Sequence, residues 1–309
     1  MTLPNKLVFT AEDAHAPGIP PMRLRRLLRG GQIVRLRKAT YTSSRTYERI
    51  AHLPRGDVVL ATFAAQNRIA VPTWVTGLSG ARLRGLAQPH AAAPTIELLA
   101  QPGTATPRRY PELRVQVARV PAAHRDELFG VRCTTTARTI TDVARRHPLS
   151  TTLIVGDHAL RSEAVTSEQL TACLADCDRM TGIVGARTAI AQLSGLRESP
   201  LESESFALFI EEGLPLPECQ VWIGRDRVDF LWPEAQLVGE ADGRQKYACD
   251  GGPPEDEHGD VLWREKVRAE RLEEQGFWVV RWTYADLLHR HALLVRRLRA
   301  RLGPWIDTR

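Results

Sequence analysis

Two acidic residues occupy the middle of two short neighbouring strands that the stretch "RVDFLWPEAQLVGEADG" predicts at residues 227–243. Proline and polar residues at 233–236 indicate a turn, and pairing outward from that turn places Asp229 opposite Glu240. Directly opposed side chains have Cβ atoms about 5 Å apart, so two carboxylates there repel each other. A bound cation would remove that repulsion, and Mg²⁺ prefers carboxylate, water and phosphate oxygens. We therefore predict a Mg²⁺ site shared by Asp229 and Glu240.

A third carboxylate comes from the helix that "SPLESESFALFIEEGLP" predicts just before this hairpin, beginning near Ser199 and ending at Gly213. With helical periodicity, Glu202 falls in the middle of the apolar face. A glutamate on the buried side of a helix is unusual without a partner, so we expect it to reach Asp229 and Glu240 as a third metal ligand. The alternative is that Glu202 only occupies the helix N-terminus, where the helix dipole favours an acid.

Other polar residues in chemically suggestive places have simpler structural interpretations. Asp242 points to the same face as Glu240 and lies opposite Arg227, so an ion pair with Arg227 would explain it. Three more residues sit inside predicted amphipathic helices without partners at a useful spacing, which favours a structural role: Asp142, Asp157 and His158.

The positive charge of the chain is concentrated at its front. The net charge is +6, but residues 1–50 hold ten Lys and Arg against three Asp and Glu, whereas residues 200–309 hold 15 against 21. A compact basic segment followed by an acidic one indicates an anion-binding module attached to something else.

The basic segment has the pattern of a winged helix-turn-helix. Thr10 and Asp13 form an N-cap signal for a first helix ending near Gly18, and Pro20 opens a second helix, "MRLRRLLRGG". The following "QIVRLRKATYTS" alternates apolar and basic residues like a β-hairpin wing. Such a fold places its second helix in the major groove and its wing near phosphates. The predicted contacts to double-stranded DNA are Arg23, Arg25, Arg26, Arg29, Arg35, Arg37 and Lys38. The alternative is an amphipathic helix whose arginines are only its solvated face.

The stretch "FTAEDAHAPGIPPMRLRRLLRGGQIVRLRKATY" resembles the N-terminal winged helix of AbiEi-type antitoxins, which belong to type IV toxin–antitoxin systems and are common in actinobacteria. The family pattern usually has Gly where this chain has Ala39. The resemblance implies binding to the promoter of the protein's own operon and a following domain that contributes to antitoxicity. It also implies a cognate nucleotidyltransferase-type toxin as partner.

The C-terminal third resembles the Vsr-like branch of the PD-(D/E)XK nuclease fold through "SPLESESF", "RVDFLWPE", "LVGEADGRQKY" and "LWREKVRAERLEEQGFWVVRWTYADL". This resemblance implies that Glu202, Asp229 and Glu240 are metal ligands. It places Asp242 as an auxiliary acid where many relatives have Lys, and Lys246 is the nearest cation that could compensate. In that chemistry, metal-bound water attacks a phosphodiester.

The 309 residues predict an α/β fold (α+β overall) in three parts: a winged helix-turn-helix at 1–50, an α/β domain at 51–195, and a restriction-endonuclease-like mixed sheet flanked by helices at 196–309. In the middle part, residues 57–86 are expected to be helical segments broken at Pro72 and Gly80, while "TIELLA" and "LRVQVARV" are expected to be strands.

The composition indicates a cytoplasmic protein without a membrane partner. Apolar residues make up 43%, and no apolar run approaches the roughly 18 residues that a spanning helix needs. The five cysteines are scattered and odd in number, which indicates reduced thiols. Cys173 and Cys177 lie four apart on a predicted helix, with no His or Cys pair near them in the sequence to complete a zinc site.

Two functions of different class follow from these patterns. In the first, the protein is a DNA-binding antitoxin or transcriptional regulator that keeps a nuclease fold as a scaffold. In the second, it is a Mg²⁺-dependent DNA endonuclease guided by its winged helix.

Overall fold

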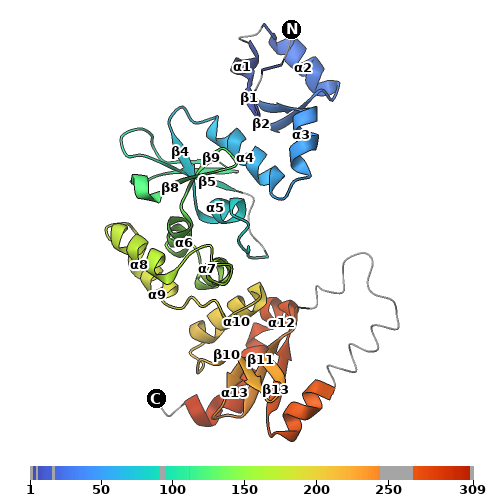
Figure 1. Ribbon diagram of the computed structural model, residues 1–309, viewed down its shortest axis with the longest axis vertical. Coiled ribbons are helices and arrows are strands. Elements are labelled where there is room, and N and C mark those ends of the chain that lie inside the picture. Colours follow the sequence, from blue (N-terminus) through green and yellow to red (C-terminus); the bar gives the residue numbers. More distant parts are fainter. Residues whose placement is uncertain are drawn as a thin grey trace. The chain divides into compact units, whose positions relative to one another are not determined.

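The computed structural model of the protein describes residues 3–4, 6–15, 18–90, 95–110, 112–243 and 267–306. Its described parts form two compact units, Met1–His147 with Ala164–Thr188, and Pro148–Glu163 with Ala189–Arg309 (Figure 1). Helices and strands occur in both units, and the strands form three separate sheets, so the expected α/β (α+β) class is confirmed. Lys246 lies outside the described residues.

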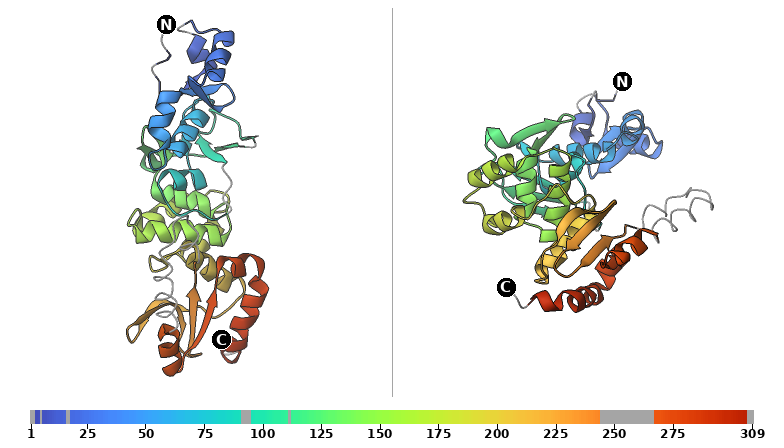
Figure 2. Two further views of the ribbon diagram at one scale, coloured as in Figure 1. Left: turned by 90° about the vertical axis from the view of Figure 1, so that its right-hand side faces the viewer. Right: turned by 60° about the horizontal axis from the view of Figure 1, so that its bottom comes forward.

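The first unit begins with the expected winged helix (Figures 1 and 2). Thr10 and Asp13 cap the first helix reciprocally: the Asp13 N–H donates to the Thr10 hydroxyl at 3.1 Å, and the Thr10 N–H donates to the Asp13 carboxylate at 2.8 Å. Pro20 is the N-cap of the second helix. A three-stranded antiparallel sheet of order β1-β3-β2 completes the fold. The elements are β1 (Phe9–Thr10), α1 (Ala11–His15), α2 (Pro21–Arg29), β2 (Ile33–Arg37) and β3 (Thr40–Ser43).

A mixed six-stranded sheet of order β6-β7-β5-β4-β9-β8 follows in the same unit. Its core is built from valines and leucines of the central strands, packed against α4 and α5. The strands are β4 (Thr73–Val75), β5 (Ile96–Ala100), β6 (Arg108–Tyr110), β7 (Leu113–Val117), β8 (Arg125–Leu128) and β9 (Val131–Thr134). The helices are α3 (Ser44–Ala51), α4 (Gly56–Gln66), α5 (Gly77–Leu83), α6 (Thr136–Ala144), α8 (Ser167–Asp176) and α9 (Ile183–Ile190), with a 3₁₀ turn at Ala122–His124.

Two predictions for this region were partly wrong. The strands in "TIELLA" and "LRVQVARV" are present as β5 and β7, but the segment expected to be helical throughout contains strand β4 directly after Pro72. Gly80 does not break a helix, since it lies inside α5. A Cβ atom at Gly80 would lie 3.1 Å from the Thr139 side chain of α6, so this glycine allows the two helices to approach closely.

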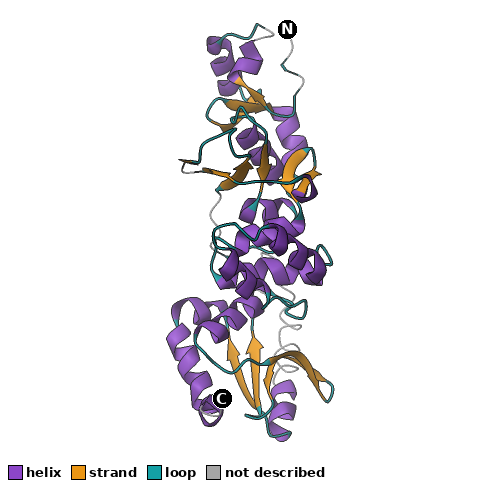
Figure 3. Ribbon diagram, turned by 90° about the vertical axis from the view of Figure 1, so that its left-hand side faces the viewer, coloured by secondary structure: helices purple, strands orange, loops and turns teal. Residues whose placement is uncertain are grey.

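The second unit is a mixed four-stranded sheet of order β10-β11-β12-β13, flanked by helices (Figure 3). Strands β10 to β12 are antiparallel, whereas β12 and β13 are parallel. The elements are α7 (Leu149–Arg161), α10 (Pro200–Glu211), β10 (Glu218–Ile223), β11 (Asp226–Trp232), β12 (Leu237–Ala241), β13 (Trp278–Trp282), α12 (Tyr284–His289) and α13 (His291–Ile306), with a further helix at 267–274.

An aromatic cluster fixes the position of α10 on this sheet. The Phe209 ring packs edge-to-face against Phe230, Trp232 and Trp282 at centroid distances of 5.3, 5.3 and 5.9 Å. A Cβ atom at Gly239 would lie 2.7 Å from the Trp282 ring, so only glycine fits between the tryptophans there. Helix α10 is therefore held against β11 and β12, which carry Asp229 and Glu240.

The three predicted domains stay a prediction, because the compact units follow a different division of the chain. Helix α7, which we assigned to the middle domain, belongs to the second unit, where Leu153 joins the core around Phe206 and Phe209. No helix of the described residues is both long and apolar enough to cross a membrane.

Candidate nucleic-acid interface and carboxylate site

Helix α2 separates leucines from arginines. Leu24 is buried, and Leu27 and Leu28 are half-buried against the core formed by Phe9 and Ile33. The four arginines predicted to face DNA are all exposed: Arg23, Arg25, Arg26 and Arg29. A helix with this pattern presents a continuous cationic face while its apolar stripe anchors it.

The basic residues of the wing differ in their surroundings. Arg35 and Lys38 are exposed, as a phosphate contact requires. The Arg37 side chain is only 8% exposed, and its guanidinium donates a hydrogen bond of 2.7 Å to the backbone oxygen of Glu112. Burial lowers the pKa of Arg37, although the Glu112 carboxylate opposes that shift. Arg37 therefore ties the wing to the neighbouring sheet, and its predicted DNA contact is the weakest of the seven.

The carboxylates of Glu202 and Asp229 lie together, linked by an amide that the sequence did not suggest. The Gln220 side-chain nitrogen donates to the Glu202 carboxylate at 2.9 Å and to the Asp229 carboxylate at 3.2 Å. Asp229 also accepts a hydrogen bond of 2.8 Å from the backbone N–H of Ala241. Gln220 reaches both acids from a left-handed backbone conformation, with φ of 57°. Such a conformation interrupts strand periodicity, so sequence patterns could not have placed this side chain.

Glu202 occupies the helix start, as the second interpretation expects, and its role as a metal ligand stays a prediction. Ser199 caps α10, with its hydroxyl accepting from the Glu202 N–H at 3.2 Å, and Glu202 in turn accepts from the Glu198 N–H at 2.8 Å. The side chain is therefore part of the helix start. It is nevertheless buried and close enough to Asp229 for the two charges to repel.

Glu240 is buried on β12. The register of β12 against β11 is the predicted one, since Trp232 pairs with Leu237 and Phe230 pairs with Gly239. Its carboxylate accepts a hydrogen bond of 2.8 Å from the Arg268 guanidinium. The hairpin thus brings a second acid next to Asp229, with an arginine as its counter-ion.

The pKa values show that this cluster resists full ionisation. Burial raises the pKa of Asp229 to about 6, and the nearby Glu202 charge adds to the shift. Burial likewise raises the pKa of Glu240 to about 7, with repulsion from Asp229 added and attraction to Arg268 opposing it. Two acids with raised pKa values on adjacent strands are the kind of group that a bound cation would stabilise.

A Mg²⁺ ion would have to displace protein hydrogen bonds to enter this cluster. Gln220 and the Ala241 N–H occupy the Asp229 oxygens, Gln220 and the Glu198 N–H share one Glu202 oxygen, and Arg268 holds Glu240. These three acids are also not among the described groups whose donor atoms converge within 4.8 Å. The ligand set is present, but an amide and a guanidinium stand where an ion would bind.

The expected ion pair between Asp242 and Arg227 is wrong for the described residues. Arg227 instead pairs with the Glu198 carboxylate at 2.6 Å. The backbone N–H of Asp242 donates to the Trp282 oxygen at 2.7 Å, which continues the pairing of β12 with β13. Asp242 therefore ends the strand that carries Glu240.

The sequence offers no His or Cys pair beside the two cysteines, but the fold brings one histidine from a distant segment to them. In the described part of the chain, His124 lies beside Cys173 and Cys177, with one donor atom of each within 4.8 Å of the others and all three buried. These three residues could hold a zinc ion by spacing. The Arg138 guanidinium, 3.3 Å from the His124 ring, already supplies a cation there. The turn that carries His124 is remote in sequence, which is why spacing arguments missed it.

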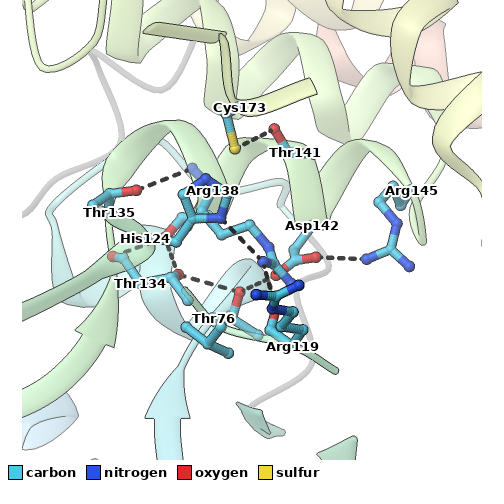
Figure 4. Close-up of polar contacts among 12 residues, drawn as sticks. Thr76, Arg119, His124, Thr134, Thr135, Arg138, Thr141, Asp142, Arg145 and Cys173 are labelled. Carbon is cyan, nitrogen blue, oxygen red and sulfur yellow. Dashed lines mark hydrogen bonds and ion pairs between the residues drawn. The ribbon is translucent and has the colours of Figure 1, made fainter. Parts of the chain in front are cut away.

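Asp142 and Asp157 have the structural roles expected for them. Asp157 accepts from Arg197 at 2.6 Å, from the Ser203 hydroxyl at 2.7 Å and from the Ser194 N–H at 2.9 Å. Asp142 accepts from the Thr76 hydroxyl at 2.8 Å and lies against arginines of its own helix (Figure 4). Burial lowers the pKa of His158, so this side chain favours its neutral form.

Comparison with known proteins adds two findings. A family model described as a transcriptional regulator, AbiEi antitoxin, matches residues 5–43, which are the elements β1 to β3. Two proteins of Mycobacterium tuberculosis, the uncharacterized proteins MT2308 and Rv2248, are each 31% identical over 205 residues, covering 65% of this chain and 71% of theirs.

Proposed function

We propose that the protein is a DNA-binding regulator of the AbiEi antitoxin type, because the chain belongs to the same family as the two mycobacterial proteins and its N-terminal winged helix matches the AbiEi antitoxin regulators. It would bind double-stranded DNA at the promoter of its own operon. Helix α2 would enter the major groove, and the wing would contact phosphates.

The observation that carries this proposal is the division of α2 into a leucine side and an arginine side. Leu24 is 6% exposed, whereas Arg25, Arg26 and Arg29 face solvent. An anchored helix with a cationic exposed face can approach DNA without rearrangement, so little ordering cost opposes binding. The matched family segment ends with β3, so it covers the helix and the wing together.

The test compares two matched pairs of adjacent arginines in fluorescence-anisotropy titrations with the promoter fragment. Arg25→Ala/Arg26→Ala should weaken binding by at least about tenfold, since each charged contact is worth about 1 kcal/mol or more. Arg296→Ala/Arg297→Ala, which removes the same charge from the exposed side of α13, should leave affinity unchanged. Equal losses in both variants would show that only net charge matters and would refute the assignment of α2.

We further propose a nucleotidyltransferase-type toxin as the protein partner, as the antitoxin family suggests. If so, a gene for such an enzyme should adjoin this one, and co-expression should relieve its toxicity. Rescue should persist in Arg25→Ala/Arg26→Ala, because antitoxicity would not require the DNA-binding helix.

A second candidate function, Mg²⁺-dependent DNA endonuclease, is favoured by one observation: three carboxylates gather where α10 packs on the inner strands β11 and β12, and two of them have raised pKa values. When bound, the ion would activate water and stabilise the leaving oxygen. Glu202, Asp229 and Glu240 would hold it, while Arg268 would have to release Glu240.

Thermal melts with and without Mn²⁺ and a plasmid-nicking assay test this candidate together. Nicking that depends on Mn²⁺ or Mg²⁺ and disappears in Asp229→Asn, while DNA binding persists, would support it. The absence of both nicking and a metal-dependent melting shift in the wild-type protein would leave the cluster as scaffold only.

A further inference from the structure

The first unit contains a cavity of about 790 Å³ between the end of β7, helix α6 and the residues that follow α8. This volume lies in the range of sites for small molecules and cofactors. Its lining is dominated by charge, with five arginines and two aspartates: Arg119, Arg138, Arg145, Arg146, Arg179, Asp176 and Asp178. Arg119 and Arg179 are exposed at the rim, whereas the other three arginines lie deeper.

The inner wall of the cavity holds more positive than negative charge. The single carboxylate of Asp142 faces three guanidinium groups, at 3.0 Å from Arg138, 2.7 Å from Arg145 and 3.3 Å from Arg146. The three side chains are 1%, 7% and 14% exposed. Although burial opposes it, the arginines hold the pKa of Asp142 below its usual value, so this acid is ionised. One buried negative charge against three positive ones leaves an excess that an anion would balance.

The pKa of Arg146 reflects the same excess. Burial lowers this pKa most, Arg145 and Arg138 lower it further, and Asp142 and Glu97 raise it. Glu97 does not neutralise the group alone, since it also pairs with the Arg114 guanidinium at 3.5 Å. The cluster as a whole therefore remains cationic.

Two guanidinium nitrogens of side chains that line the cavity donate no hydrogen bond. Among the described residues, Arg138 Nη2 and Arg146 Nη1 are buried and have no hydrogen-bond partner. The remaining Arg138 nitrogens are fixed, because Nε donates to Asp142 at 3.0 Å and Nη1 donates to the Arg119 backbone oxygen at 3.2 Å (Figure 4). Both side chains line the cavity, and buried charged donors without partners are costly, so an acceptor that reached these nitrogens from the cavity would be stabilised.

We propose that this cavity is a binding site for a small phosphate ester, with the phosphate held by Arg138 and Arg146. A phosphate offers three acceptor oxygens and close to two negative charges, which matches two guanidinium donors and the local charge excess better than a single carboxylate does. Arg119 and Arg179 at the rim add attraction. Asp176 and Asp178 supply acceptors for hydroxyl or amino groups on the rest of the ligand.

The test uses isothermal titration of the full chain with pyrophosphate and with adenosine monophosphate as probes. Binding of at least one probe is expected, and Arg119→Ala/Arg179→Ala should weaken it by about tenfold. The control Arg108→Ala/Arg132→Ala removes the same charge from exposed positions of the same sheet and should leave affinity unchanged. Arg138→Lys keeps the inner charge but removes Nη2, so it should also weaken binding, with the melting temperature recorded to verify folding.

Four results would overturn the proposal. The first is no binding of either probe at millimolar concentration. The second is an equal loss of probe affinity in Arg119→Ala/Arg179→Ala, the rim variant, and in its control Arg108→Ala/Arg132→Ala. The third is loss of probe binding in Arg25→Ala/Arg26→Ala but not in the rim variant, because the anion would then occupy the winged helix. Binding of citrate without pyrophosphate would also contradict the phosphate chemistry.

Discussion

At the scale of single residues, the acids of the second unit show what periodicity can and cannot predict. Alternation along β11 and β12 and helical spacing along α10 correctly indicated that Glu202, Asp229 and Glu240 share one side of the sheet. The side chains that donate hydrogen bonds to these acids were not predictable. Gln220 reaches them from a left-handed backbone conformation, and Arg268 reaches Glu240 from the helix at 267–274, which is distant from β12 in the sequence.

The raised pKa values of Asp229 and Glu240 predict a defined pH dependence of stability. Folding favours the protonated form of both acids, so their contribution to the free energy of unfolding is complete below about pH 4 and is lost as the pH rises through about 6 and 7. Without added metal, Asp229→Asn should therefore raise the free energy of unfolding at pH 8, by about 1–3 kcal/mol. The gain should shrink below pH 5, where the wild-type acid is protonated.

Urea unfolding of both proteins at pH 5 and pH 8 measures this difference. Glu234→Gln, an exposed acid in the turn of the same hairpin, should show no such pH-dependent gain. A destabilisation by Asp229→Asn that is equal at both pH values would mean that its hydrogen bonds to Gln220 and Ala241 outweigh charge repulsion.

Ala39 adopts a backbone conformation that suits glycine. Its φ is 59°, in the turn between β2 and β3, and its carbonyl accepts a hydrogen bond of 3.0 Å from the Ala11 N–H. Left-handed conformations cost a non-glycine residue about 1 kcal/mol or more. Ala39→Gly should therefore raise the melting temperature of the protein, by a few degrees at most. The exposed Ala175→Gly in α8 serves as the control and should lower it, since glycine destabilises a helix.

At the scale of elements, strong local patterns gave correct predictions and short or tightly packed segments did not. The cap at Thr10, the stop at Gly30 and strand β5 each follow from a local rule. Strand β4 has only three residues, too few for an alternation to be recognised. Gly80 looked like a helix break, because the close approach of α6 that requires glycine is a tertiary contact.

Helix α7 is joined to the segment just before α10 by a buried ion pair. Asp157 and Arg197 are 1% and 2% exposed, and burial raises the pKa of Asp157 despite this partner. Removing one charge leaves the other buried and unpaired, so Asp157→Ala should cost about 3–5 kcal/mol of the free energy of unfolding. The double variant Asp157→Leu/Arg197→Met should cost clearly less. Chemical denaturation of the wild-type protein and the two variants checks this, and a loss in the double variant as large as that in Asp157→Ala would contradict the buried-pair account.

At the scale of the whole molecule, the number of units and their membership depended on packing that the sequence does not record. The amphipathic pattern of α7 shows that one face is buried but not which core receives it, so we placed it in the middle domain. The winged helix was predictable almost completely, because caps, leucine stripe and hairpin are all local features. The arginine-lined cavity was not, since its arginines come from the segment after β7, from α6 and the residues directly after it, and from the segment after α8.

The salt dependence of DNA binding tests the central claim that the exposed arginines of α2 contact phosphates and bases of double-stranded DNA. The logarithm of the binding constant falls linearly with the logarithm of the salt concentration. Each phosphate contact makes the slope of this line more negative by about 0.9. The wild-type protein should show a steep decline, and Arg25→Ala/Arg26→Ala should reduce its slope by about one to two units, whereas Arg296→Ala/Arg297→Ala should not change it. An unchanged slope in the α2 variant, at unchanged affinity, would contradict the account.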